Sequence, residues 1–283
     1  MTTYTCFDVS FDDKVAHIQL KRPDAFNTMT RAFWNELPAI VNQINDEGRA
    51  RAIVISSTGK HFSAGMDLSV FTDGQGAVGD GQRAEPGRAR ANLRHDVHRL
   101  QKTFSCLDEA RMPVLMAVQG GCIGGAVDMS TCADMRYATA DAFFVIQEIN
   151  LAMTADVGTF PRLCHLLPQG LVRELAYSGR RLSAKKAHEL GFVNEIFDSQ
   201  EAMLKHVFEI AHEIASKSPL AVHGSKVMIN YARDHSIADG LDYIATWQAG
   251  MFNPTADMME SFKAKQEKRA PAYEDLLPLR KAM

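Results

Sequence analysis

The apolar positions in the first two thirds of the chain follow two different periods. Residues 14–20 (KVAHIQL) alternate as a half-buried strand does, and residues 51–57 (RAIVISS) and 113–118 (PVLMAV) form short apolar runs typical of buried strands. Residues 28–45 and 91–107 repeat apolar side chains at steps of three and four, which predicts helices. Strands that alternate with helices predict an α/β fold of mainly parallel strands covered by helices.

The strand pattern ends near residue 198. We therefore predict a core of residues 1–198 and a helical C-terminal region of residues 199–283. The many apolar positions of this region would pack on the core, on a neighbouring subunit or on both. Its helices are expected over residues 200–216, 219–231, 237–251 and 255–268.

One stretch interrupts the regular pattern of the core. Residues 72–90 (TDGQGAVGDGQRAEPGRAR) are rich in glycine and contain few large apolar side chains, which predicts a mobile surface loop. Long loops inside compact domains are often lids or binding loops, but an insertion without function would have the same composition. The residues leave both interpretations open.

The overall composition limits the class of protein. The 283 residues are 46% hydrophobic and 23% charged, with a net charge of −3, so no general basic field attracts nucleic acid. No apolar stretch reaches the roughly 18 residues of a membrane span. The five cysteines form no CxxC pair, which predicts neither a zinc site nor a disulfide framework. With no signal-peptide pattern, we expect a cytoplasmic protein without nucleic-acid or membrane partners.

Two turns rich in small residues each follow an expected buried strand. They are HFSAGMDL (residues 61–68) and GGCIGGAVDM (residues 120–129). Ligands of open α/β folds collect at the carboxyl ends of the strands, where helix N-termini present unpaired N–H groups. One N–H group from each turn could converge on a single oxygen. Such an oxyanion hole suits a carbonyl that becomes an enolate.

The residues of these turns resemble a known family, the enoyl-CoA hydratase/isomerase or crotonase superfamily. The resemblance covers nearly the whole chain and also includes RPDAFNTM (22–29), FVIQEINLAM (144–153) and ELGFVNEIF (189–197). It implies a spiral of repeated ββα units followed by a helical trimerisation region, in a homotrimer or a dimer of trimers. It also implies an acyl-CoA thioester as substrate and no metal, flavin or nicotinamide cofactor.

The same resemblance implies which residues hold the substrate. The two oxyanion-hole donors would be the backbone N–H groups of Ala64 and Gly125. Lys268 of a neighbouring subunit would approach the phosphates, although a solvated surface lysine is a nearly equal alternative. The other expected substrate contacts are Ala25, Phe26, Asn27, Gly65, Met66, Asp67, Leu68 and Ala126.

Three acids distinguish the hydratases of this family from the dienoyl-CoA isomerases. Asp128, Glu148 and Asp156 together resemble the Δ3,5-Δ2,4-dienoyl-CoA isomerase branch of the family, whereas hydratases have a glutamate at the first position and a small residue at the third. The resemblance implies that Asp156 serves C2, that Glu148 serves C6 and that Asp128 assists. The residues alone leave open which of Asp156 and Glu148 serves C2 and which serves C6. Like charges in an apolar pocket should raise at least one pKa.

Other interpretations of these acids remain open at this point. A 2-enoyl-CoA hydratase would use Asp128 and Glu148 to hold a water molecule. A non-enzymatic protein on the same fold would bind RNA instead. Each acid could also be a helix cap or an ion-pair partner, and Asp156 in particular could cap a helix that begins near residue 158.

Overall fold

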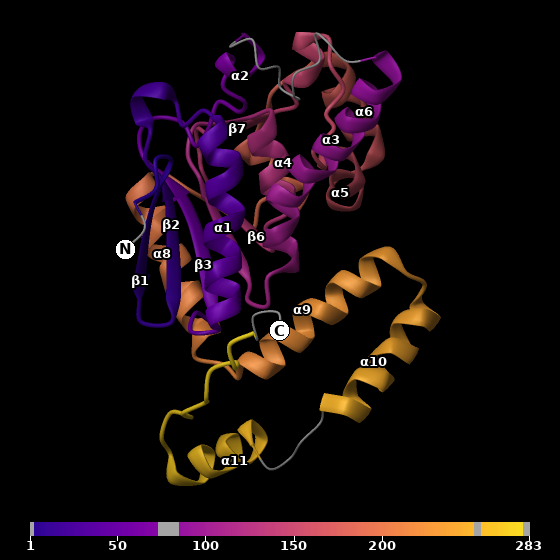
Figure 1. Ribbon diagram of the computed structural model, residues 1–283. Coiled ribbons are helices and arrows are strands. Elements are labelled where there is room, and N and C mark those ends of the chain that lie inside the picture. The colour runs from indigo at the N-terminus through magenta and orange to yellow at the C-terminus, as the bar shows by residue number, and fades with distance from the viewer. Residues whose placement is uncertain (1–2, 73–84, 252–255, 280–283) are drawn as a thin grey trace.

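The computed structural model describes residues 3–72, 85–251 and 256–279. Its largest sheet has six strands in the order β1-β2-β3-β4-β6-β9 (Figure 1). The β1–β2 pair is antiparallel, and the other neighbouring pairs are parallel. These strands are β1 (Phe7–Asp12), β2 (Val15–Leu20), β3 (Ala52–Ser57), β4 (Val114–Val118), β6 (Met135–Thr139) and β9 (Glu195–Phe197).

A second sheet has three short strands, β5 (Gly121–Ile123), β7 (Phe143–Val145) and β8 (Leu182–Ser183), in the order β5-β7-β8. Strand β4 of the large sheet is followed by β5 of the small sheet and then by helix α4 (Gly125–Thr131). Strands β6 and β7 repeat this order before the 3-10 helix η2 (Glu148–Leu151) and helix α5 (Thr159–Leu166). The repeat confirms the α/β fold of successive ββα units.

Side chains alternate between the two faces of the large sheet because successive residues of a strand point to opposite sides. Val54 and Ala117 pack on one face with helix α8 (Gln200–Ala215). Ile53 and Ile55 point to the other face, into the core shared with helices α1 (Arg31–Glu47) and α3 (Pro86–Glu109). Helix α1 ends at Gly48, which has the left-handed φ of +69° that favours glycine.

The last helices leave the sheets as an arm, formed by α9 (Pro219–Asp234), α10 (Ile237–Met251) and α11 (Asp257–Glu267) (Figure 1). The chain then returns to the core, where the Leu279 N–H donates to the Asp46 carbonyl over 2.8 Å. The C-terminal helices lie where the spacing predicts them. Helix α8 packs on the large sheet and only the helices after it form the arm, so the boundary at residues 198–199 stays a prediction.

The prediction of a loop over residues 72–90 is wrong at its C-terminal end. Residues 86–90 form the first turn of α3, because Pro86 occupies the first helical position and the Glu85 carboxylate accepts hydrogen bonds from the Gly87 and Arg88 N–H groups. Residues 73–84 of that segment lie outside the described residues. The remaining helices are η1 (Pro23–Ala25), α2 (Ser69–Thr72), α6 (Gln169–Ser178) and α7 (Ala184–Glu189), and no described helix is long and apolar enough to cross a membrane.

Candidate active site

A cavity of about 700 Å³ lies where α4 meets the turn after β3 and the segment after β7. Its wall is mainly apolar, and Trp34 and Met66 contact each other there through the indole Nε1 and the sulfur, 3.2 Å apart. Trp34 had no expected role in the sequence, since a tryptophan on an amphipathic helix is typical of a core. The residues expected in the site that line this cavity are Ala25, Phe26, Ala64, Met66, Asp67, Leu68, Gly125, Asp128, Glu148 and Asp156.

The two small-residue turns are in direct contact at the cavity. Ser63 pairs with β5 through its N–H to the Gly121 carbonyl and its carbonyl to the Ile123 N–H, both over 3.1 Å. Gly65 has a φ of +83°, and a Cβ there would lie 2.5 Å from the Ile123 carbonyl oxygen and 3.4 Å from the Gly125 nitrogen. The close approach of the two turns therefore requires glycine at position 65.

Of the two expected oxyanion donors, one has a free N–H group in the described chain and the other does not. Gly125 is the first residue of α4, and its N–H has no hydrogen-bond partner among the described residues. The prediction for Ala64 is wrong, because its N–H already donates to the Phe26 carbonyl over 2.9 Å. The Gly65 N–H donates to the Ser63 hydroxyl, so the next N–H without a partner in the described chain is that of Met66.

Asp128 lies in α4 and is 1% exposed. Its Oδ1 accepts a hydrogen bond from the Thr159 N–H over 2.8 Å, which caps the start of α5, while Oδ2 is buried without a partner among the described residues. Burial raises the pKa of the Asp128 carboxyl to about 6, although the bonds from Thr159 oppose the shift. The carboxyl thus joins α4 to α5 and also faces the cavity.

Glu148 opens η2 and turns its carboxyl toward α4. A Cβ on Gly124 would lie 3.4 Å from Glu148 Oε1, and Oε2 is buried without a partner in the described chain. Burial, and after it the charge of Asp128, raise the pKa of Glu148 to about 7. The prediction that acids crowded into this pocket have raised pKa values is confirmed.

Asp156 lies in the segment between η2 and α5. Burial raises the pKa of its carboxyl as well. The alternative that Asp156 caps α5 is wrong, because the N-cap residue is Gly158 and no side chain of that cap position holds the helix. The three acids line one cavity, and Glu148 feels the charge of both others.

Some expected substrate contacts lie behind the cavity wall rather than on it. Asn27 is 2% exposed and its side chain is used by the turn, because Nδ2 donates to the carbonyls of Thr58 and His61. Gly65 and Ala126 belong to the packing between the turns. Lys268 is the C-cap residue of α11, a helix of the arm (Figure 1), and it does not line the cavity.

The donors and acids together suit proton transfer next to a carbonyl. Two N–H groups can hold an oxygen that becomes negative, and a protonated and an ionised carboxyl in one apolar cavity can deliver and remove protons. No cluster of histidine, cysteine, aspartate or glutamate in the described residues could hold a metal ion.

Known proteins resemble the chain over most of its length. A family model described as enoyl-CoA hydratase/isomerase matches residues 10–276. The mitochondrial Delta(3,5)-Delta(2,4)-dienoyl-CoA isomerase of Mus musculus is 42% identical over 257 residues, 90% of this chain and 77% of that protein. The peroxisomal Delta(3,5)-Delta(2,4)-dienoyl-CoA isomerase of Arabidopsis thaliana is 36% identical over 265 residues, 94% of each.

A solved structure has the same architecture. The enoyl-CoA hydratase of Bacillus anthracis superposes with a TM-score of 0.82 at 29% identity and covers 95% of this chain and 99% of its own. The expectation of a cytoplasmic location is contradicted by the two relatives named above, which are described as mitochondrial and peroxisomal. The missing signal-peptide pattern was a poor guide because organelle import does not use that pattern.

Proposed function

The chain belongs to the enoyl-CoA hydratase/isomerase family, and on this premise we propose that it is an isomerase that converts 3,5-dienoyl-CoA into 2,4-dienoyl-CoA during fatty acid oxidation. The observation that carries the proposal is the third acid, Asp156, which shares the cavity with Glu148 and Asp128. A hydration site needs two acids on one water. A third acid suits a reaction in which one carbon loses a proton and a distant carbon gains one.

The reaction moves one proton off C2 and one onto C6. When a base takes the C2 proton, the electron pair of the C–H bond forms a double bond between C1 and C2 and the thioester carbonyl oxygen becomes negative, so that C1 to C6 form one conjugated trienolate. Protonation at C6 then leaves double bonds at C2 and C4, and no atom is gained or lost. The N–H groups of Met66 and Gly125 would hold the oxygen throughout.

The protonation state of each acid decides whether it removes the C2 proton or delivers a proton to C6. The pKa of Glu148, raised to about 7 by burial, leaves a large part of this carboxyl protonated at neutral pH, so it can deliver the proton to C6. Asp156 acts as the base at C2. Asp128 anchors α5 through Thr159 and adds charge beside Glu148. The enzyme needs no metal, flavin or nicotinamide for this chemistry.

An absorbance assay tests the function. Purified protein is mixed with 3,5-dienoyl-CoA, and the ultraviolet band of the conjugated 2,4-dienoyl product is followed. We expect the band with the wild type and a loss of about 10²–10⁴-fold in kcat with Asp156→Asn, because the variant lacks a base. Asp198→Asn, an exposed acid change outside the cavity, should keep full activity. Full activity of Asp156→Asn would remove this residue from its role.

A second candidate, 2-enoyl-CoA hydratase, is favoured by one observation. Asp128 Oδ2 and Glu148 Oε2 are both buried without partners among the described residues, as two acids that hold a water molecule would be. Fast hydration of crotonyl-CoA without any dienoyl-CoA isomerisation would support this candidate against the first. The non-enzymatic candidate, RNA binding, predicts a salt-dependent shift of RNA by a protein inactive in both assays.

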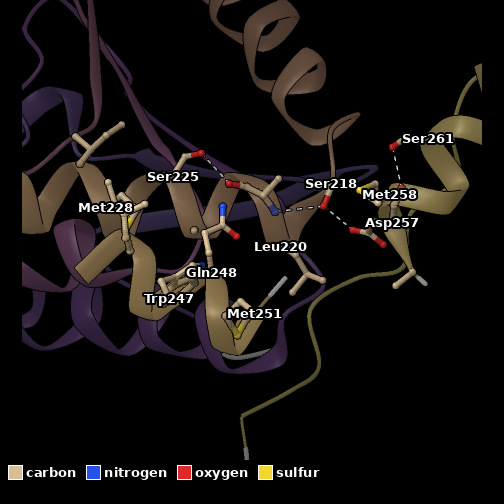
Figure 2. Close-up of a pocket in the computed structure, with 15 residues that line it drawn as sticks. Ser218, Leu220, Ser225, Met228, Trp247, Gln248, Met251, Asp257, Met258 and Ser261 are labelled. Carbon is tan, nitrogen blue, oxygen red and sulfur yellow. Dashed lines mark hydrogen bonds between the residues drawn. The ribbon is translucent and has the colours of Figure 1, made fainter. Parts of the chain in front are cut away.

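We propose further that the arm joins chains into a homotrimer or a dimer of trimers. Large apolar side chains of the arm are exposed in the single chain, among them Ile237 at 84% and Leu241 at 64%. A cavity of about 710 Å³ opens between α9, α10 and α11, and Met228, Trp247 and Met251 point into it (Figure 2). Such a surface is too apolar to remain in water. In the assembly, Lys268 of a neighbour would reach the phosphates of CoA.

A further inference from the structure

The backbone that carries Asp156 is held by few hydrogen bonds. The segment between the end of η2 and the start of α5 has no regular secondary structure. Within the part of the chain that the structure describes, the N–H groups of residues 154–158 donate to no other residue. The direction of the Asp156 carboxyl therefore depends on the side chains that hold this segment from outside.

Two side chains hold it, one at each end of the stretch from Asp156 to Thr159. Asp128 accepts the Thr159 N–H, as described above. Gln101 of α3 donates from Nε2 to the carbonyl oxygen of Asp156 itself over 2.8 Å. The second bond matters more for the acid, because it fixes the peptide unit that directly follows the Asp156 side chain.

Gln101 is in turn held in one orientation. Its Oε1 lies 3.1 Å from Nδ1 of His98, one helical turn earlier on α3, so the amide oxygen faces the imidazole and the amide nitrogen faces Asp156. Because the amide oxygen and the amide nitrogen of Gln101 each have a hydrogen-bond partner, the side chain has one preferred rotamer. The amide oxygen can only accept, so His98 Nδ1 is the donor and bears the hydrogen.

Helix α3 is fixed against α5 by further contacts on the same face. Ser105 lies four residues after Gln101 and accepts from Arg162 over 3.1 Å, and Asp108 pairs with Arg162 over 3.6 Å. These spacings place the three residues on one side of the helix. Gln101 is the member of this row nearest the cavity, and it does not line the cavity itself.

We propose that Gln101 is a positioning residue that aims the Asp156 carboxylate at C2 by holding its main-chain carbonyl. The proposal rests on the proposed isomerase function. Proton transfer from carbon requires the base within hydrogen-bond reach, and a displacement of about 1 Å can lower the rate about 10²-fold. Because Gln101 does not contact the substrate, its loss should lower kcat and leave binding unchanged.

The test is Gln101→Met, which keeps the length of the side chain and removes the donor. We expect kcat for 3,5-dienoyl-CoA to fall by about tenfold or more, with KM within twofold of the wild type. Calorimetric titration with octanoyl-CoA, which has no double bond to isomerise, should give the wild-type dissociation constant and the wild-type number of sites per chain. Lys102→Met is the matched control, because it makes the same kind of change at the next, exposed position of α3. It should keep the wild-type kcat, KM, dissociation constant and number of sites.

Three outcomes separate the possibilities. If the wild type itself forms no 2,4-dienoyl-CoA, the proposed function fails. If the wild type is active and Gln101→Met keeps kcat within twofold of it, the positioning role is overturned. The role is also overturned if the activity of Gln101→Met falls only as far as the number of octanoyl-CoA sites per chain falls, because the variant would then merely contain less folded protein. Should Gln101→Met fail to fold, Gln101→Glu serves instead, because it keeps the acceptor for His98 and turns an oxygen toward the Asp156 carbonyl. It should then show the same loss of kcat at unchanged KM.

Discussion

Asp128 combines a structural and an electrostatic effect in one carboxyl group. One oxygen caps α5 through the Thr159 N–H, so the residue helps to place the segment that carries Asp156. The other oxygen has no partner in the described chain, and the charge of the group raises the pKa of Glu148. An acid that is not itself in the proton pathway can therefore add to the effect of burial on the pKa of Glu148.

The charge of Asp128 should make the protein less stable as the pH rises. Burial raises the folded-state pKa from 3.8 to about 6, so the stabilisation is complete below about pH 4 and is lost as the pH rises through 6. Asp128→Asn keeps an oxygen for Thr159 and has no charge. Between pH 4 and pH 8 its free energy of unfolding should therefore fall by about 2 kcal/mol less than that of the wild type.

Urea unfolding at the two pH values measures this difference. Asp198→Asn is the control, since its exposed carboxyl should leave the wild-type dependence on pH intact. If the free energy of unfolding fell equally in Asp128→Asn and in the wild type between pH 4 and pH 8, the charge of Asp128 would not destabilise the folded state.

From the sequence we could predict that the three acids gather at one site, but not which N–H group of the first turn is free. Asp128 and Glu148 each follow the second strand of a ββα unit, and Asp156 follows Glu148 in the segment between η2 and α5. Which N–H remains free at the first turn depends on the Phe26 carbonyl, which comes from a distant part of the chain and takes the Ala64 N–H. No local pattern contains that information, and the same is true of the bond from Gln101 to Asp156.

Helix α9 connects the arm to the core through a buried lysine. Lys226 is 6% exposed, and its Nζ donates to the carbonyls of Leu107 and Met112 over 2.9 and 3.1 Å and to Asp134 Oδ2 over 2.8 Å. Three acceptors around one ammonium fix the start of the arm against the end of α3 and the turn before β6. An ammonium buried in this way is stabilising only while its partners stay in place.

Removal of this ammonium should loosen the base of the arm. Lys226→Met removes the cation that pairs with the Asp134 carboxylate and leaves it, among the described residues, only the Val114 N–H, so we expect the free energy of unfolding to fall by about 3 kcal/mol. Lys217→Met, which removes an exposed pair with Glu213, should change it by less than about 0.5 kcal/mol. Chemical denaturation of both variants gives the comparison, and equal small effects would show that Lys226 does not anchor α9.

Periodicity predicted elements better than their ends. The buried strands and the C-terminal helices lie close to their expected ranges because one face of each is apolar. The start of α3 was missed because its first turn is held by Glu85 and Pro86 rather than by an apolar face. The short strand β5 was taken for a turn, because its pairing with β7 and its bridge to Ser63 join parts of the chain that are distant in sequence.

The whole molecule is a compact double sheet with an arm that its own chain does not cover. Burial of the exposed apolar side chains of α9–α11 by other subunits would remove them from water, at roughly 25 cal/mol per Å² of apolar area. The C-terminal tail ties the far end of the arm back to the core at Asp46. The arm is thereby held at both ends, ready to present one face to a neighbour.

A charge placed on that face should separate the subunits. Leu241→Asp in α10 should convert the assembly into monomers in sedimentation velocity at micromolar concentration, because an unpaired carboxylate would be buried at the contact. Tyr177→Asp, on α6 and 70% exposed, is the control on the core and should leave the sedimentation coefficient unchanged. A monomeric wild type, or a variant that stays assembled, would contradict the proposed arrangement.

The contact between Gly65 and β5 has a consequence for how the protein folds. The Met66 and Gly125 donors lie on separate turns, one after β3 and one after β5, so a chain in which only one of these turns has formed holds only half of the oxyanion hole. A thioester ligand would then bind the finished fold and none of its collapsed precursors. At a hundred times its dissociation constant it would stabilise that fold by about 2.7 kcal/mol, and it could serve as a probe for the moment at which the two units meet.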